Sequence, residues 1–143
     1  MYKNAIVGYS ASSIITAAAS GKTYEQTVIS KGGNVATGSS CRAGGIYNNS
    51  GSIYLGYTEL SGTTPVAAAG ENAFTGGVMG NYASDQGGGI FMSGGKLYMN
   101  KGNISWNKTE TAGGGGVRVS NSAKMYMYGG SIKGNTVATN GGG

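Results

Sequence analysis

The chain has 143 residues, the length of a single domain, with 38 % apolar residues and a formal net charge of +5. Its 30 glycines lack the every-third-residue period of collagen, and a charged fraction of 10 % excludes charge-rich disorder. The ten basic residues are scattered, and no apolar run is long enough for a membrane helix. We therefore expect neither a nucleic-acid partner nor membrane insertion.

The first 43 residues contain a weak version of a pattern that returns later in the chain. Ile6, Ile14 and Val28 match apolar positions of the later segments, so we expect degenerate coils over residues 1–43. The alternative is a secretory signal, because a weakly apolar stretch leads to Ala17 and Ala19, which would form a small-residue cleavage site.

A glycine-punctuated repeat occupies the rest of the chain, and its copies open at Gly44, Gly87 and Gly113. Ile90 corresponds to Val117, and the other positions of these two copies also correspond: Leu97 with Met125, Met99 with Met127, Ile104 with Ile132 and Asn107 with Asn135. We assign one coil each to residues 44–86, 87–112 and 113–140, and residues 141–143 to the start of a truncated coil. The first of these coils carries an insertion at residues 61–74, which we expect to be a recognition loop or, as the alternative, a short flap over the core.

Apolar residues within each copy alternate with a period of two, which is the pattern of strands. Ile90 with Met92 and Leu97 with Met99 follow this pattern, and no segment shows the apolar spacing of a helix. The sequence therefore predicts an all-β fold, a single-stranded parallel β-helix (solenoid) with about 27 residues and three short strands per coil, as one domain over residues 1–143. Successive coils should lie about 4.8 Å apart.

Equivalent residues of successive coils should lie directly above one another. Ile53, Leu97 and Met125 would then form one inward column, and the tyrosine that follows each of them would point outward. We expect an outward tyrosine column, flanked by Lys96 and Lys124, that consists of Tyr54, Tyr98 and Tyr126. Trp106 is a further candidate exposed aromatic residue. These residues could either stabilise the sheet or bind carbohydrate.

Three asparagines recur at one position of the repeat. Asn81, Asn107 and Asn135 each follow an inward apolar residue by three positions, at a predicted corner of the coil. Asparagine at such a corner can bond to backbone groups and to its neighbours in the stack. We therefore predict a structural asparagine ladder rather than a ligand site.

The repeat resembles a known type of protein. The segments "GGGIFMSGGKLYMNKGNISWNKTETA" and "GGGGVRVSNSAKMYMYGGSIKGNTVATN" are similar to the Gly-Gly-Gly-[Ile/Val] … Gly-x-Ile-x-x-Asn repeats of right-handed parallel β-helix proteins of bacterial surfaces and secretions. These include adhesin-like, autotransporter-passenger-like and polymorphic outer-membrane-like chains. The resemblance implies right-handed winding and a secreted or cell-surface location. Pectin-lyase-like enzymes share the architecture, so fold alone does not define the activity.

The residues for catalysis are sparse. The candidate acid pair is Asp85 and Glu110, which both lie just before a glycine run, and glycoside hydrolysis needs two carboxylates at one bond. The chain has no histidine and one cysteine, so we expect no metal site and no cofactor.

These observations predict a non-enzymatic structural or adhesive module of a secreted or cell-surface protein, possessing an outward tyrosine ladder for carbohydrate. The expected partners are a glycan or a host or partner-cell surface, with end-to-end self-association as a further contact. Two alternatives stay open: a fragment of a polysaccharide-acting, pectin-lyase-like enzyme, and a self-assembling fibre or oligomer subunit.

Overall fold

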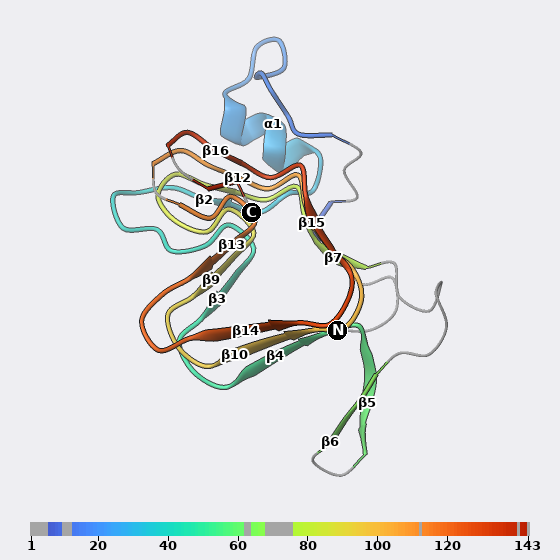
Figure 1. The fold of residues 1–143 in the computed structure, drawn as a ribbon. Helices are drawn as coiled ribbons and strands as arrows, with labels where there is room; N and C mark the ends of the chain where they lie inside the picture. The colour runs from blue at the N-terminus through green and yellow to red at the C-terminus, as the bar shows by residue number, and fades with distance from the viewer. Residues whose placement is uncertain are drawn as a thin grey trace.

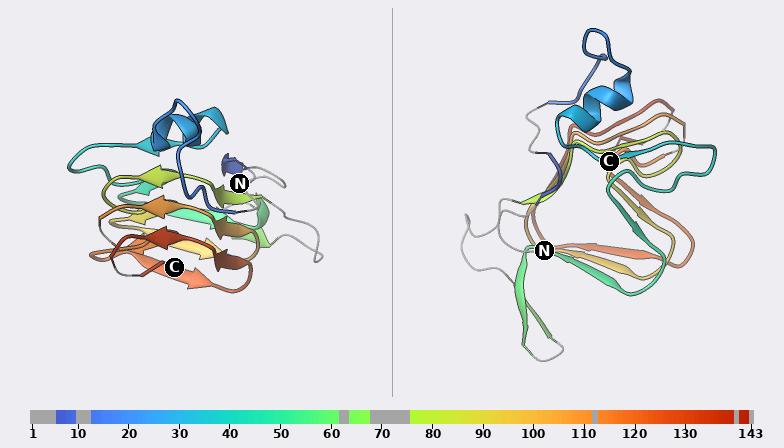
Figure 2. Two further views of the ribbon diagram at one scale, coloured as in Figure 1. Left: turned by 90° about the horizontal axis from the view of Figure 1, so that it is seen from above. Right: turned by 180° about the vertical axis from the view of Figure 1, so that it is seen from behind.

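Short strands from successive repeats lie side by side in parallel and form four sheets around one interior (Figure 1). The structure is a computed structural model, and it describes residues 6–9, 13–61, 64–67, 76–111, 113–139 and 141–142. Figure 1 looks along the stack of repeats, and Figure 2 shows the same strands layered from the side.

Each sheet takes one strand from each successive part of the chain. The first sheet contains β1 (Ile6–Gly8), β7 (Gly77–Met79), β11 (Asn103–Ser105) and β15 (Ser131–Lys133). The second contains β2 (Val35–Ala36), β8 (Tyr82–Ala83), β12 (Lys108–Thr109) and β16 (Thr136–Val137). The third contains β3 (Ile46–Asn48), β9 (Ile90–Met92) and β13 (Val117–Val119). The fourth contains β4 (Ser52–Leu55), β10 (Lys96–Met99) and β14 (Lys124–Met127), and we call its solvent side the tyrosine face.

The pairing register confirms the predicted columns. Leu97 pairs with Ile53 on one side and with Met125 on the other, and Ile104 pairs in the same way with Val78 and Ile132. The fold is thus mostly β with parallel sheets, which is compatible with a solenoid. Each complete repeat contributes four strands to the stacked sheets rather than the expected three. The fourth was not predicted because it has only two residues and no apolar alternation.

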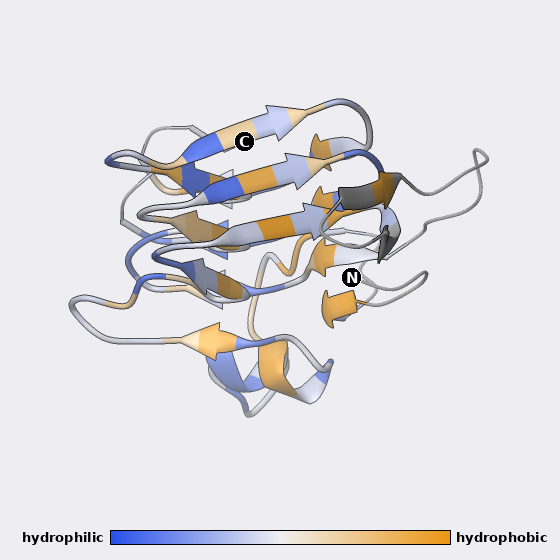
Figure 3. Cartoon of the chain, turned by 90° about the horizontal axis from the view of Figure 1, so that it is seen from below, coloured by the Kyte–Doolittle hydropathy of each residue, from blue (hydrophilic) through white to orange (hydrophobic). Residues whose placement is uncertain are grey.

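The inward columns form one narrow hydrophobic core. Its buried members come from all the sheets except that of β2, and they are Leu55, Val78, Ile90, Met92, Leu97, Met99, Ile104 and Val117. Figure 3 shows the hydrophobic segments of successive strands one above another. On β14, which is the last strand of its sheet, the inward position Met127 is 48 % exposed because no further strand covers it in the described chain.

A short helix lies between the strands β1 and β2 in the N-terminal region. Helix α1 (Tyr24–Ser30) contains Val28, and it lies beside the sheet of β2 at the N-terminal end of the stack (Figures 1 and 2). The Thr23 hydroxyl accepts from the Gln26 amide and the Gln26 side chain accepts from the Thr23 amide, which is a capping box. The expectation that no helix is present was wrong, because seven residues are too few for apolar periodicity to be visible.

The predicted insertion is in part a β-hairpin. Strands β5 (Tyr57–Ser61) and β6 (Thr64–Ala67) pair antiparallel, so the excursion begins before residue 61. The hairpin projects away from the four sheets in Figure 1. Residues 62, 63 and 68–74 of the predicted insertion lie outside the described residues.

The asparagine column forms a continuous hydrogen-bonded ladder, as predicted. The Asn107 side-chain oxygen accepts from both the backbone amide and the side-chain amide of Asn81, each at 3.0 Å. Its own side-chain amide donates to the Val78 carbonyl at 2.8 Å and to the Asn135 side-chain oxygen at 3.0 Å. Asn34, which the repeat did not reveal, begins the ladder by donating to the Asn81 side-chain oxygen.

Glycines leave the space that this ladder needs. A Cβ atom on Gly89 would lie 2.8 Å from the Asn107 side-chain nitrogen and 2.6 Å from the Gly116 carbonyl oxygen. The equivalent Gly116 would bring a Cβ to 2.5 Å from the Asn135 side-chain nitrogen. The last glycine of each run before β9 and β13 is therefore required by packing.

We expect Asn107→Ala to lower the free energy of unfolding by about 3 kcal/mol, because it leaves the buried Asn81 amide and Val78 carbonyl without partners. The matched control is Asn34→Ala at the exposed end of the ladder, which should cost less than about 1 kcal/mol. Urea unfolding followed by circular dichroism measures both variants. Equal losses would contradict a cooperative ladder.

Candidate binding face

Three tyrosines form a continuous ring stack on the tyrosine face. Tyr54, Tyr98 and Tyr126 occupy one register position of β4, β10 and β14, and all three are half-buried. The Tyr54 and Tyr98 ring centres lie 5.1 Å apart with 6° between the ring planes, and Tyr98 and Tyr126 lie 5.1 Å apart with 10° between them. The strand separation of a parallel sheet, close to the spacing of stacked rings, makes this arrangement possible.

Stacking covers ring faces within the column. Both faces of Tyr98 lie against neighbouring rings, and the Tyr54 and Tyr57 rings make an edge-to-face contact with centres 5.4 Å apart and 74° between the planes. A sugar that stacks on an aromatic residue needs an open ring face. The three stacked tyrosines alone are therefore a poor sugar platform, and a ligand must use their edges and hydroxyls or other rings.

Two further tyrosines complete a pocket beside the stack. Tyr54, Tyr57, Tyr98 and Tyr128 line a pocket of about 380 Å³. Tyr57 comes from the start of the β5–β6 hairpin, and Tyr128, which follows β14, is 68 % exposed. Burial raises the pKa of Tyr57, and the neighbouring Tyr128, Tyr54 and Tyr98 add to that effect.

The contributions of Tyr57 and Tyr128 to this pocket were not predicted from the sequence. The run "MYMY" from Met125 to Tyr128 does place a second tyrosine near the column, but outside the strand. Nothing in the sequence indicates that Tyr57 would lean against Tyr54, because the hairpin departs from the repeat.

Trp106 does not belong to the tyrosine face. It follows β11, has φ of 59° and is half-buried. Its indole lies against Gly134, the equivalent residue of the next repeat, where a Cβ would collide with the ring. Tyr9 packs against Gly80 in the same way, so this column alternates aromatic residues with glycines as a packing device.

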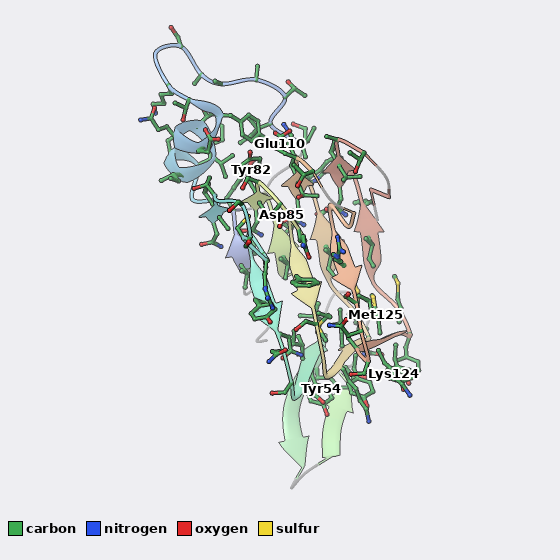
Figure 4. The ribbon with its side chains drawn as sticks, turned by 90° about the vertical axis from the view of Figure 1, so that its left-hand side faces the viewer. Tyr54, Tyr82, Asp85, Glu110, Lys124 and Met125 are labelled. Atoms are coloured by element: carbon green, nitrogen blue, oxygen red, sulfur yellow. The ribbon has the colours of Figure 1, made fainter. Side chains whose placement is uncertain are left out.

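The two candidate catalytic carboxylates have separate partners. Asp85 accepts from the Thr111 hydroxyl at 3.0 Å and from the Gln86 side-chain amide at 3.3 Å. Glu110 pairs with Lys108 at 2.8 Å. Figure 4 shows both carboxylate residues at the end of the molecule opposite Tyr54 and Lys124. The geometry therefore gives no shared acid site near the aromatic pocket.

Lys108 and Glu110 belong to a cluster that holds helix α1 against the sheet of β2. The Lys108 ammonium lies 4.2 Å from the Tyr24 ring centre, and the Tyr24 and Tyr82 rings are 5.1 Å apart. Burial raises the pKa of Tyr82 to about 12, and the negative charge of the nearby Glu110 carboxylate adds to the shift. The pKa of Tyr24 is raised still further, chiefly by burial.

The comparisons with known proteins give no family assignment. Comparison with protein-family models, with curated proteins and with solved structures found no match. Among the described residues, no group of three or more Cys, Asp or Glu side chains is placed to hold a metal ion. None of the described helices is long and apolar enough to span a bilayer.

Tyr98→Ala should lower the free energy of unfolding by about 2 kcal/mol, because it removes two ring contacts of about 1 kcal/mol each. Tyr126→Ala removes one such contact and should lose about half as much, while Tyr98→Phe keeps the stack and should stay close to the parent. Urea unfolding at neutral pH compares the three variants. A larger loss for Tyr126→Ala than for Tyr98→Ala would be inconsistent with a stack centred on Tyr98.

The raised tyrosine pKa makes the stability of the fold pH-dependent in alkali. The folded state holds the Tyr82 proton up to about pH 12, whereas tyrosines of the unfolded chain ionise near pH 10. The free energy of unfolding should therefore be constant below about pH 10 and fall as the pH rises toward 12. Tyr82→Phe should reduce that fall, as measured by urea unfolding at stepwise increasing pH. A fall of the same steepness in the variant would exclude Tyr82 as a cause.

Proposed function

We propose that the chain is a right-handed parallel β-helix with coils of about 27 residues, and a non-enzymatic adhesive module of a secreted or cell-surface protein. Its binding site for carbohydrate is the tyrosine pocket formed by Tyr54, Tyr57, Tyr98 and Tyr128. The pocket is the observation that carries this proposal, because it combines aromatic surface with several hydroxyl groups in one concave site.

The strand pairing along the chain supports the solenoid. Ile90 pairs with Val117 and Leu97 pairs with Met125, so each position meets its equivalent in the next repeat. In Figure 1 the chain runs anticlockwise from β3 through β4 and β7 to β8. The view from above in Figure 2 shows that the C-terminal strands lie nearer the viewer of Figure 1. This course favours right-handed winding, the usual hand of parallel crossovers.

The chemistry of the pocket supports a sugar ligand. Tyr57 stands nearly perpendicular to Tyr54, so its ring plane does not lie within the stack. Tyr128 is the most exposed of the large hydrophobic residues described. Open tyrosine rings pack against the C–H faces of a pyranose, and phenol hydroxyls exchange hydrogen bonds with sugar hydroxyls. Asp85 and Glu110, engaged elsewhere with different partners, support a binding role over hydrolysis.

A glycan array with the intact chain tests this function. We expect binding to a subset of glycans that is weakened about tenfold or more in Tyr57→Ala and in Tyr128→Ala, since each loses an aromatic contact at the pocket. The control is Ile29→Ala, which removes a large apolar side chain that is 59 % exposed on helix α1, away from the tyrosine face. No glycan binding by the parent chain, or equal losses in the control, would reject the proposed site.

A further inference from the structure

Two lysines stand beside the tyrosine stack in an arrangement that is unfavourable in the unliganded protein. Lys96 and Lys124 are exposed and occupy directly paired positions of β10 and β14. Paired residues of neighbouring strands lie about 5 Å apart, so the two ammonium groups share one small region of the surface. Like charges in directly opposite positions destabilise a sheet.

No acidic residue of this sheet compensates the pair. The strands β4, β10 and β14 contain no Asp or Glu, and the position before them in the lysine column is Ser52. The ion pair described, Lys108 with Glu110, lies on another sheet. Figure 4 places Lys124 near Tyr54 and far from Asp85 and Glu110, so neither of these two carboxylates lies beside the lysine pair.

The lysines lie on the same side of the sheet as the tyrosines. Lys96 and Tyr98 are two residues apart on β10, and the residue between them, Leu97, is fully buried. Alternation along a strand therefore puts the two side chains on one surface, with their Cα atoms about 7 Å apart. The same relation holds for Lys124 and Tyr126 on β14.

The adjoining sheet continues this basic and aromatic character. Arg118 of β13 lies over the Phe91 ring at 5.7 Å, and Phe91 stacks on Tyr47 with ring centres 5.6 Å apart. The Arg42 guanidinium donates to the Tyr47 hydroxyl at 2.8 Å. The tyrosine face and the neighbouring sheet of β9 and β13, with Arg42 in the segment before β3, thus present cations near aromatic rings.

We propose that the tyrosine face binds an anionic glycan, with Lys96 and Lys124 contacting sulfate or carboxylate groups while the tyrosine pocket takes a sugar ring. This inference rests on the proposed carbohydrate function and adds the charge of the ligand. Ammonium groups donate charge-assisted hydrogen bonds to such anions, and the ligand charge relieves the repulsion between the two lysines. A nucleic acid would need a longer row of cations along its backbone than this pair provides.

The test compares two polymers that share one backbone, dextran sulfate and unmodified dextran, by isothermal titration calorimetry with the intact chain. We expect dextran sulfate to bind and its affinity to fall with rising NaCl concentration. The double variant Lys96→Gln/Lys124→Gln should weaken this binding roughly tenfold. The matched control Lys22→Gln/Lys133→Gln removes the same charge from exposed lysines elsewhere and should change the affinity by less than about twofold.

Each outcome separates this inference from the proposed function. Equal weakening in both double variants, or binding unaffected by either, would overturn the lysine site. Glycan-array binding that depends on Tyr57 but is restricted to neutral sugars would overturn the anionic ligand and leave the proposed function standing. Duplex DNA that competes as strongly as dextran sulfate at equal charge would show a general polyanion surface and also overturn the inference. Circular dichroism of both double variants checks that they are folded.

Discussion

The asparagine ladder holds the paired strands of successive repeats in register. The amide of Asn107 bonds simultaneously to the repeat before it and to the repeat after it, and its oxygen accepts two hydrogen bonds from Asn81. A shift of one residue in any strand would leave several of these groups buried without partners, which a fold of marginal stability cannot tolerate. The ladder also explains the glycine next to it, because any side chain at Gly89 would occupy the space of the Asn107 amide. Glycine and asparagine therefore recur together in the repeat, because each asparagine of the ladder needs a glycine beside its side-chain amide.

A fixed register turns the outer surface into columns of equivalent positions. Each position of a strand lies beside the equivalent position of the neighbouring repeat. An interaction between two such residues can therefore recur with the same geometry from one repeat to the next. The repetition allows the rings of Tyr54, Tyr98 and Tyr126 to stack, because the strand separation matches the spacing of stacked rings. The surface chemistry of the tyrosine face is thus a direct consequence of the hydrogen bonding in the interior. The pocket arises where the repetition is interrupted, at the start of the β5–β6 hairpin and after β14.

The sequence predicted the features that depend on repetition and missed those that depend on single contacts. The pairing of Leu97 with Ile53 and Met125 follows from the spacing of identical motifs, and so do the tyrosine and asparagine columns. Asn34 was missed because Lys31, rather than an apolar residue, stands three positions before it, and Tyr57 because its position depends on how the hairpin leaves the sheet. The capping box of helix α1, Thr23 with Gln26, is visible in the sequence, but seven residues are too few to show the apolar spacing of a helix. Local signals and single tertiary contacts lie outside what a repeat alignment can detect.

Some columns of equivalent positions change residue type between repeats, and others keep residues that repel one another. At the position of Trp106, which has positive φ, aromatic residues alternate with Gly80 and Gly134, so each bulky ring rests on an empty neighbour. That column demonstrates that the repeat can change residue type from one level to the next when packing demands it. The lysine column does not make this adjustment, although a polar residue such as Ser52 occupies the same position one level earlier. Two adjacent like charges on a rigid surface raise the energy of the unliganded state and lower the relative energy of a state with an anion bound between them. The same rigidity that prevents the lysines' strands from moving apart therefore makes Lys96 and Lys124 a preorganised pair of cationic contacts.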